Sequence, residues 1–352
     1  AEPSAARSTL PRPSATLDCV EADEELGQIL AFRRLSPLLA SAGQPEPADI
    51  AAIGRAGFKH LINLALPTSP GALANEAALA EQAGLRYLHL PIDFDAPEPE
   101  RAARLFSELT ELREQPVFVH CAKNMRVSAL LSAYRMVLGG VPCQVARADL
   151  HAIWQPNPTW RRYVSNAAVQ ALPQPVRIET ERLLLRDAEL SDADAMIGYT
   201  TDPEVCRYMI WGPNTPDQTR DHLQRRVTAL QTESARRAFE LLIVEKATGE
   251  VIGGAGLRVA DSDDLDGSLG YVLARSKWGQ GIMPEACAKQ LEVAFGWFGL
   301  HRVWASTDAE NLASQRVLEK LGMRREAHFV QNQLVKGQYR DTRVFALTDS
   351  EY

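Results

Sequence analysis

The chain has 352 residues, of which 45% are hydrophobic and 24% charged, the composition of a globular protein long enough for two domains. Lys and Arg total 38 against 45 Asp and Glu, so the net charge of −7 excludes a general electrostatic attraction to nucleic acid or to anionic lipid. Five cysteines without CxxC or Cys/His metal spacing exclude a disulfide scaffold and a zinc site, and they favour a reducing, cytoplasmic setting. No apolar run reaches the ~18 residues that a membrane span needs.

Two stretches of biased composition predict the domain limits. Residues 1–17 are rich in Pro, Ser, Ala and Thr and lack a basic region followed by an apolar one, so they predict a disordered tail rather than a secretory signal. Residues 166–175 place Pro173 and Pro175 after small and polar residues, which predicts a linker. We therefore expect one domain over residues 18–165 and a second over residues 176–352.

Strand and helix patterns alternate in the first of these domains. Short apolar runs predict strands over residues 57–64, 87–92 and 116–120, and helical spacing predicts helices over residues 75–83, 98–113 and 127–138. The alternation is typical of a layered α/β domain.

A cysteine stands where the third of these strands ends. Cys121 is followed by a short loop and by the helix predicted from residue 127. A cysteine at a strand end is usually a core residue. A cysteine before a helix, with Arg126 in the same loop, can instead serve as the nucleophile that attacks a phosphate monoester.

This part of the chain resembles the protein tyrosine and dual-specificity phosphatases, including the bacterial branch whose domains begin with a GQP segment. The resemblance lies in residues 41–64, 84–94 and 116–129. It implies that Cys121 is the nucleophile, that Arg126 binds the phosphoryl oxygens, and that Asp93 or Asp95 protonates the leaving oxygen.

The loop departs from the family signature in its spacing. Four residues separate Cys121 from Arg126, whereas the signature has five, so an ungapped comparison puts Val127 at the arginine position and Ser128 at the hydroxyl position. Asn124 replaces a common glycine and needs to accept a positive φ. Two hypotheses follow: a working phosphatase, or a non-catalytic module that binds phosphate or protein.

The second domain is predicted to be mixed α/β. We expect strands over residues 178–186, 239–245, 251–259, 268–273 and 302–307, helices over residues 284–298 and 314–321, and a closing hairpin.

A glycine-bearing turn joins the strand ending at Leu273 to the helix opened by Pro284. Backbone N–H groups at a helix N-terminus bind phosphate, and glycines let the ligand approach the backbone. The alternative is a tight turn whose glycines only supply positive φ.

Residues 176–352 resemble the GNAT acetyltransferase superfamily, particularly the branch that acetylates ribosomal-protein N-termini and related amines. The motifs are ETERLLLRDAELSDADAM, TDPEVCRYM, GEVIGGAGL, SKWGQGIMPEA and NLASQRVLEKLGM. The resemblance implies that acetyl-CoA is the cosubstrate and that Val272 and Leu273 pair with its pantetheine arm. It implies a cofactor-binding turn made of Trp278, Gly279, Gln280, Gly281, Ile282 and Met283.

Asn311 and Ser314 lie three residues apart at the start of a predicted helix, where they share a face. By spacing alone they could be capping residues only. The resemblance implies that Asn311 contacts the cofactor and that Ser314 protonates the departing thiolate, because the tyrosine that many relatives carry seven residues after the asparagine is Leu318 here. No general base is nominated; Glu240 and Asp266 are more simply explained as solvated side chains.

These patterns together predict an N-acetyltransferase in which an amine attacks acetyl-CoA directly, without a metal and without a covalent acetyl-enzyme. The acceptor is a primary amine, either a protein N-terminus or a small molecule. Loops over residues 210–217 and 330–339 are expected to form its binding surface.

Overall fold

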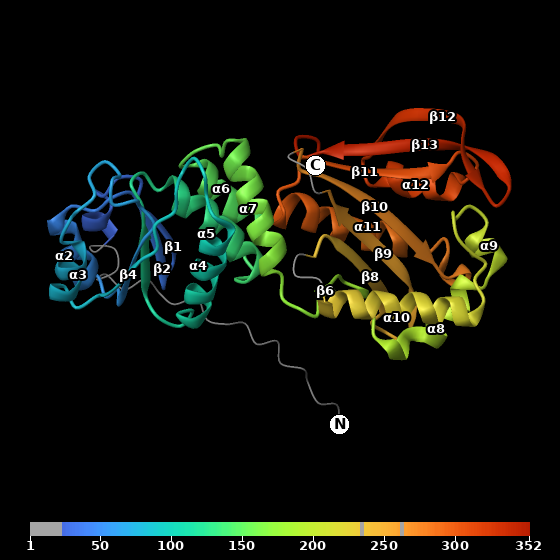
Figure 1. Ribbon diagram of the computed structural model, residues 1–352, viewed down its shortest axis with the longest axis horizontal. Helices are drawn as coiled ribbons and strands as arrows, with labels where there is room; N and C mark the ends of the chain where they lie inside the picture. Colours follow the sequence, from blue (N-terminus) through green and yellow to red (C-terminus); the bar gives the residue numbers. More distant parts are fainter. Residues whose placement is uncertain (1–22, 233–235, 261–263) are drawn as a thin grey trace, which may run out of the picture. The chain divides into compact units, whose positions relative to one another are not determined.

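The structure is a computed structural model that describes residues 23–232, 236–260 and 264–352 (Figure 1). It divides into two compact units, Ala1–Ser128 with Ala152–Trp154 and Ala129–His151 with Gln155–Tyr352. The tail predicted over residues 1–17 lies outside the described residues. The mixed α/β class predicted from the sequence is confirmed, with a separate sheet in each unit.

The first unit contains a five-stranded sheet in the order β1-β2-β5-β3-β4. Its strands are β1 (Arg33–Ser36), β2 (Leu39–Ala42), β3 (His60–Asn63), β4 (Arg86–His89) and β5 (Val117–His120). β1 pairs antiparallel with β2, and the other neighbours are parallel. Every residue of β3 and β5 is buried, as expected for central strands of a parallel sheet. Their carboxyl ends meet at one edge, where Cys121 follows β5.

The helices of this unit are α2 (Pro47–Arg55), α3 (Glu76–Gln82), α4 (Pro99–Glu111) and the beginning of α5 (Met125–Val137). α2 and α4 each begin with proline, whose fixed φ suits the first helical turn. α4 buries Ala102, Leu105, Phe106 and Leu109, which recur at helical spacing. The three strands and three helices predicted here are therefore confirmed, with ends shifted by a few residues.

The second unit contains an eight-stranded sheet in the order β12-β13-β11-β10-β9-β8-β7-β6. The strands are β6 (Arg177–Glu179), β7 (Leu183–Arg186), β8 (Ala238–Glu245), β9 (Val251–Val259), β10 (Asp266–Leu273), β11 (Arg302–Asp308), β12 (Arg324–Val335) and β13 (Gln338–Thr348). All neighbours are antiparallel except β10 and β11. The closing hairpin predicted from the sequence is β12 and β13.

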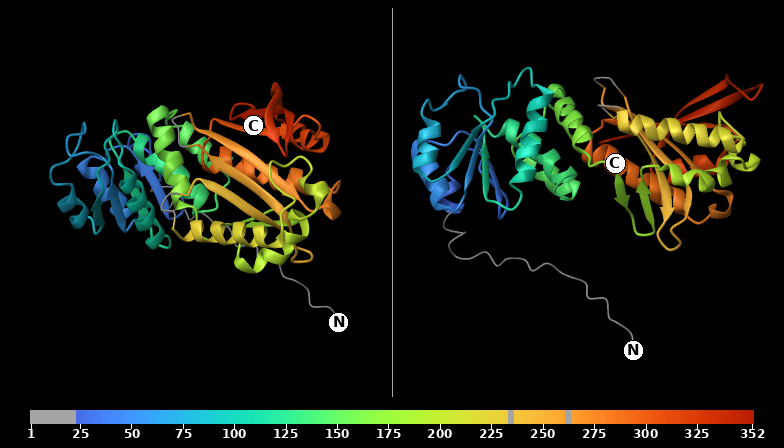
Figure 2. Two further views of the ribbon diagram at one scale, coloured as in Figure 1. Left: turned by 45° about the vertical axis from the view of Figure 1, so that its right-hand side comes forward. Right: turned by 60° about the horizontal axis from the view of Figure 1, so that its bottom comes forward.

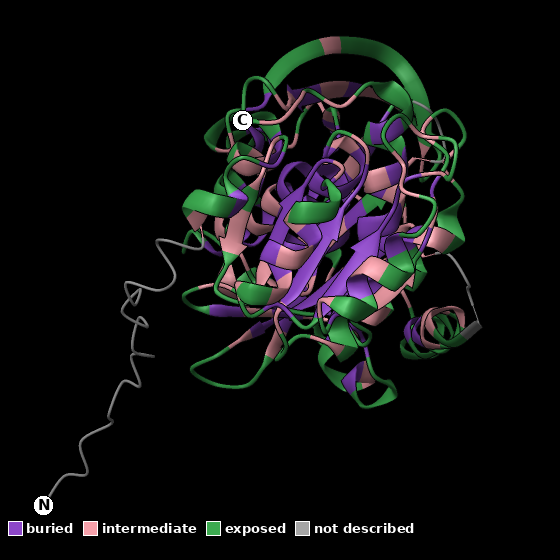
Figure 3. Ribbon diagram, turned by 90° about the vertical axis from the view of Figure 1, so that its left-hand side faces the viewer, coloured by how far each residue is buried: buried purple, intermediate pink, exposed green. Residues whose placement is uncertain are grey.

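Helices cover both faces of this sheet (Figures 1 and 2). They are η1 (Leu190–Asp192), α8 (Ala193–Thr200), α9 (Pro203–Cys206), α10 (Pro216–Thr232), η2 (Arg275–Lys277), α11 (Ile282–Leu291), the π-helix η3 (Glu292–Trp297) and α12 (Leu312–Lys320). On one face, Met196 and Tyr199 of α8 and Leu223 of α10 pack around Leu242 of β8. On the other face, Gln290 of α11 donates to the Ala255 carbonyl at 3.0 Å. Buried residues concentrate in the strands (Figure 3).

Three expectations about local structure require correction. The strand predicted over residues 178–186 is a hairpin, β6 and β7, in which the Thr180 hydroxyl accepts from the Leu183 N–H. The helix predicted over residues 284–298 ends as α11 at Leu291 and continues as η3. The linker predicted over residues 166–175 is helical as far as Ala171, because α7 (Pro158–Ala171) extends through alanine-rich sequence that favours a helix.

The second unit also includes the rest of α5, α6 (Cys143–His151) and α7. In it, the Arg147 guanidinium donates to the Phe295 carbonyl of η3, and Cys143 contacts Gly296. Both contacts lie within the unit and join α6 to η3. The domain limits predicted from the sequence stay a prediction.

No helix among the described residues combines the length and the apolar character required to cross a membrane.

Candidate functional site

A cavity in the second unit lies where β10 and β11 separate. The two strands pair only at their beginnings, where the last partners are Ser268 and Trp304. β10 nevertheless continues to pair with β9 as far as Leu273, and β11 continues to pair with β13 as far as Asp308. The strands therefore diverge and leave two backbone edges facing a cavity of about 740 Å³. A strand edge of this kind can pair with an extended ligand.

A glycine turn lies at the end of β10, and helix α11 begins directly after it. Gly279 and Gly281 have φ of +75° and +74°, and Gly281 is the N-cap of α11. A residue with a Cβ is strained at such φ values, so these two positions need glycine. The N-terminus of α11 directs free N–H groups and a partial positive charge at the turn, which suits a pyrophosphate.

Most of the predicted cofactor-binding residues line this cavity. They are Val272, Leu273, Trp278, Gly279, Gly281, Ile282, Met283 and Asn311. Trp278 is held by a 2.9 Å hydrogen bond from its indole N–H to the Leu273 carbonyl. Gln280 is not among the lining residues; its side chain donates to the Ser276 carbonyl at 3.0 Å.

Arg182 is a residue of this site that the sequence analysis did not nominate. Its guanidinium donates to the Gln280 carbonyl at 3.1 Å and to Glu285 at 2.6 Å. Burial opposes ionisation of Glu285, but hydrogen bonds from Thr180 and Arg182 outweigh it and hold the pKa of Glu285 below its usual value. Arg182 thereby ties β7 and the preceding turn to the glycine turn. The sequence feature that could have identified Arg182 is its place in the motif ERLLLRDAEL.

Cationic side chains line the cavity from α12. Arg316 and Lys320 stand four residues apart, so they lie on one face of the helix, and both are exposed. A third cation, Lys277, lies near the glycine turn, where its ammonium pairs with Glu245 at 2.7 Å. Cations around a glycine turn suit a ligand that carries several phosphates.

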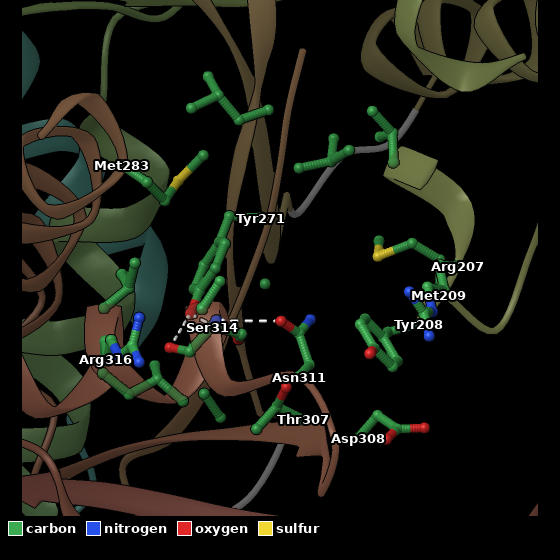
Figure 4. A pocket seen from close by; sticks show the side chains of 18 of the residues that line it. Arg207, Tyr208, Met209, Tyr271, Met283, Thr307, Asp308, Asn311, Ser314 and Arg316 are labelled. Carbon is green, nitrogen blue, oxygen red and sulfur yellow. Dashed lines mark hydrogen bonds between the residues drawn. The ribbon is translucent and has the colours of Figure 1, made fainter. Parts of the chain in front are cut away.

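Asn311 and Ser314 meet Tyr271 in the middle of the cavity (Figure 4). Asn311 is the N-cap of α12, and its side-chain oxygen accepts from the Ser314 N–H at 3.1 Å. The Ser314 hydroxyl lies 2.9 Å from the Tyr271 hydroxyl. Leu318, which stands where many relatives have a tyrosine, is fully buried. The tyrosine hydroxyl next to Ser314 therefore comes from Tyr271 of β10. The spacing of residues along the chain did not predict this contact.

The far wall of the cavity is built by α9 and by the hairpin β12–β13. Tyr208 lies between two guanidinium groups, with Arg207 at 5.2 Å and Arg340 at 5.8 Å from its ring centre. Arg340 also binds Asp308 at 2.7 Å. Of the two loops predicted to bind the acceptor, only Ile210, Gln333 and Val335 line the cavity. Glu240 and Asp266, which were not nominated as general base, do not line it; they pair with Arg258 and Arg302.

The loop after β5 in the first unit contains a residue with positive φ. Asn124 has a φ of +59°, as expected at a position where the phosphatase signature has glycine. Its amide donates to the Ala31 carbonyl at 2.8 Å and to the Ser41 hydroxyl at 3.1 Å. The conformation of Asn124 therefore fits the place of the signature glycine, and Arg126 follows it two residues later.

Val127 is fully buried, and Arg126 lies one residue earlier on α5, about 100° around the helix axis. The Arg126 guanidinium stacks over the Phe94 ring at 5.5 Å. Cys121 is buried, and Asp93 accepts from the N–H groups of Asp95 and Ala96 at 2.8 and 3.2 Å. Cys121 and Asp93 thus lie in loops, whereas Arg126 lies in the first turn of α5.

A buried polar network lies at the carboxyl ends of β3 and β5. Glu76 accepts hydrogen bonds from Asn63 at 2.5 Å, Gln44 at 2.7 Å and Tyr87 at 2.7 Å. His120 Nε2 lies 3.4 Å from a Glu76 oxygen without hydrogen-bond geometry, and neither ring nitrogen has a partner in the described part of the chain. Burial lowers the pKa of His120 to about 4, although the Glu76 charge opposes this shift. His120 is therefore a neutral buried imidazole next to Cys121.

Comparisons with known proteins match each half of the chain to a different family. Residues 182–324 match the acetyltransferase (GNAT) domain, and residues 31–136 match the phosphatase-like domain of beta-lactamase hydrolase-like protein. Among solved structures, a GNAT-family acetyltransferase from Bacillus anthracis is 26% identical with a TM-score of 0.45, covering 50% of this chain and 100% of that one.

Two bacterial relatives match the C-terminal half over nearly their whole length. The chain is 28% identical over 174 residues to the uncharacterized N-acetyltransferase YoaA of Bacillus subtilis, covering 48% of this chain and 95% of that protein. It is 36% identical over 174 residues to the uncharacterized N-acetyltransferase p20 of Bacillus licheniformis, covering 49% of this chain and 96% of that protein. The chain therefore belongs to the GNAT acetyltransferases and is an N-acetyltransferase that uses acetyl-CoA and carries a phosphatase-like domain in its N-terminal half.

Proposed function

We propose that the second unit transfers the acetyl group of acetyl-CoA directly to a primary amine, either a protein N-terminus or a small amine. The observation that carries this proposal is the divergence of β10 and β11 beside the glycine turn. The free edge of β10 at Val272 and Leu273 would pair with the pantetheine arm. The turn from Trp278 to Met283 would bind the pyrophosphate, with Asn311 beside the arm.

Ser314 is the hydroxyl that we propose as proton donor to the departing sulfur. It lies on the first turn of α12 and lines the cavity between Asn311 and Tyr271. The amine enters from the wall formed by α9 and the β12–β13 hairpin, opposite the cations of α12. The four described cysteines are free, in keeping with a reducing compartment, and the cytoplasm is the setting that we propose.

Release of free thiol from acetyl-CoA in the presence of amines tests this function. The panel should include peptides with different N-terminal residues, polyamines and free amino acids, with mass spectrometry to locate the acetyl group on nitrogen. We expect amine-dependent thiol release with one amide formed per thiol. Thiol release that is equal with and without every amine would contradict the proposed transfer.

The α12 cations should affect binding of acetyl-CoA rather than the chemical step. Replacing Arg316 and Lys320 together by alanine removes two positive charges from the cavity rim and should raise the KM for acetyl-CoA roughly tenfold, about 1.4 kcal/mol. The increase should shrink as salt is added, because exposed charges are screened. The control is the pair Arg220→Ala and Arg225→Ala on α10, which removes the same charge outside the cavity and should leave the KM unchanged. Equal effects of the two pairs would argue against a phosphate site on α12.

For the first unit we propose a non-catalytic module that binds a phosphate ester or a protein. The supporting observations are that four rather than five residues separate Cys121 from Arg126, and that Arg126 is buried with its guanidinium over the Phe94 ring. Bidentate binding of a phosphoryl group needs the guanidinium at a defined position, and the shorter spacing from Cys121 is expected to displace Arg126 from it.

Hydrolysis of p-nitrophenyl phosphate by the full chain and by its Cys121→Ser variant distinguishes the two hypotheses. We expect no hydrolysis above the variant's rate, while both proteins keep the same acetyltransferase rate as proof of folding. Hydrolysis that the substitution abolishes would instead establish a cysteine phosphatase and a bifunctional chain.

A further inference from the structure

Tyr271 and Ser314 form a hydroxyl pair that joins β10 to the first turn of α12 inside the cavity (Figure 4). The Tyr271 oxygen lies 2.9 Å from the Ser314 hydroxyl oxygen and 3.1 Å from the Ser314 carbonyl oxygen. Tyr271 thus meets two acceptor atoms of the same residue. The two residues are 43 positions apart in the sequence, so only the tertiary structure brings them together.

The Tyr271 hydroxyl carries a single hydrogen, so it donates to one of these two oxygens at a time. If it donates to the Ser314 carbonyl, the 2.9 Å contact between the two hydroxyls is a hydrogen bond only when Ser314 donates to Tyr271, and Ser314 then has no hydrogen for a ligand. If Tyr271 donates to the Ser314 hydroxyl oxygen, the hydrogen of Ser314 is free to point into the cavity. Only the second arrangement lets Ser314 act as a proton donor.

The surroundings of Tyr271 keep its hydrogen in place. Burial raises the pKa of Tyr271 above its ordinary value; the hydrogen bond with Ser314 opposes this shift and the nearby Cys287 adds to it. The phenol therefore remains protonated at neutral pH. Asn311 fixes the other side of Ser314, since its side-chain oxygen accepts the Ser314 N–H at 3.1 Å. The position of the Ser314 hydroxyl is thus determined from β10 and from its own helix N-cap.

We propose that Tyr271 is a positioning residue for acetyl transfer, which holds Ser314 with its hydrogen directed at the sulfur of acetyl-CoA and replaces that hydrogen when it is used. This inference rests on the proposed function of the second unit. It assigns a role to a tyrosine of β10. The position on α12 where many relatives have a tyrosine is occupied in this chain by the buried Leu318.

Atoms and electrons balance in this step. The amine nitrogen forms a bond to the acetyl carbon, and the carbon–sulfur bond breaks with its electron pair going to sulfur. Sulfur takes the hydrogen of Ser314, the Ser314 oxygen takes the hydrogen of Tyr271, and water returns one to Tyr271. The acetylated nitrogen releases one proton to water, so no net proton is consumed.

The test compares Tyr271→Phe, Ser314→Ala and the double variant in the full chain, at saturating amine. Each single variant should lower kcat roughly 100-fold, the lower range for loss of general acid–base catalysis, while the KM for acetyl-CoA changes less than about twofold. The double variant should be no slower than the slower single variant, because the two hydroxyls act as one unit. The control is Tyr199→Phe, which removes a buried tyrosine hydroxyl of α8 outside the cavity and should retain the wild-type kcat.

A proton inventory in mixtures of H2O and D2O gives a readout that a purely structural role would not move. The wild-type kcat should depend on the deuterium fraction along a curve, as expected when two hydrogens move, and the dependence for Tyr271→Phe should be linear or absent. A Tyr271→Phe variant that folds, binds CoA and keeps the wild-type kcat would overturn the proposal.

If Tyr271→Phe does not fold, Ser314→Ala decides alone, since a wild-type kcat in that variant removes the group that Tyr271 is proposed to position. A wild-type chain that transfers no acetyl group to any amine would instead contradict the proposed function itself.

Discussion

Replacing Gly281 by glutamate should lower the affinity for acetyl-CoA by at least 100-fold. Gly281 has a φ of +74° and is the N-cap of α11. A residue with a side chain loses about 1 to 2 kcal/mol in this conformation. The added carboxylate would also replace the ligand's phosphates at the helix N-terminus and repel them. The strain is the same with and without ligand, so it lowers the stability of the fold, and the loss of affinity comes from the carboxylate; a 100-fold loss corresponds to ~2.7 kcal/mol of binding free energy. Isothermal titration with CoA measures the change.

Gly249→Glu is a matched control for this variant. Gly249 has a φ of +73°, has open space on the side where a Cβ would be added, and does not line the cavity. It therefore reproduces the backbone strain and the added charge without touching the proposed pyrophosphate site. Equal CoA affinities for Gly281→Glu and Gly249→Glu would show that the glycine turn does not bind the phosphates.

The stability of the first unit should depend on pH through His120. The unfolded chain protonates this imidazole near pH 6.5, whereas the folded protein resists protonation until about pH 4, because the ring is fully buried. The unfolded state therefore binds more protons between these values, and the folded state is stabilised above pH 6.5 and loses that stability as the pH falls to about 4. The loss amounts to about 3 kcal/mol.

His120→Gln should remove this component. The readout is the difference between the variant and the wild type in how steeply the free energy of unfolding changes with pH. Absolute values are not compared, because carboxylates also titrate in the same range and the substitution changes the stability at every pH. Urea unfolding of the full chain at pH 7.5, 6.0 and 4.5, followed by pulsed hydrogen exchange of peptides that contain β5, isolates the unit concerned. Parallel slopes for the two proteins would mean that His120 is not the group that resists protonation.

Local patterns in the sequence determined most of the helices, strands and turns. The short apolar runs predict β3 and β5, because a strand covered on both faces has no polar side. The spacing of apolar residues predicts α4, because side chains on one face of a helix recur every 3.6 residues. The glycine turn before α11 could be predicted as an anion site for a similar reason, since two glycines, a proline and a helix start are all local features. The assignment of Asn311 to the start of α12 rests on the same kind of signal.

Alanine-rich sequence was the main source of local error. Residues 166–171 were expected to belong to a linker because they are small and polar and precede two prolines. α7 contains them because Ala167, Ala168 and Val169 are buried, and burial of a helical face decides between helix and linker where composition does not. The hairpin of β6 and β7 was missed because its short turn has no glycine or proline.

The tertiary structure alone decided which side chains meet. Tyr271 and Ser314 are 43 residues apart, and Arg182 and Glu285 are 103 apart, so neither contact leaves a periodic signal in the chain. The conformation of the loop after Cys121 also required the structure, because spacing does not reveal the positive φ of Asn124 or the burial of Arg126 and Val127. The sequence by itself determined the two families of fold and predicted the local anion site, since these depend on neighbouring residues. The contact of Tyr271 with Ser314, the hydrogen bond of Arg182 to the glycine turn and the placement of Arg126 over Phe94 depend on strand pairing and helix packing, which only the folded chain establishes.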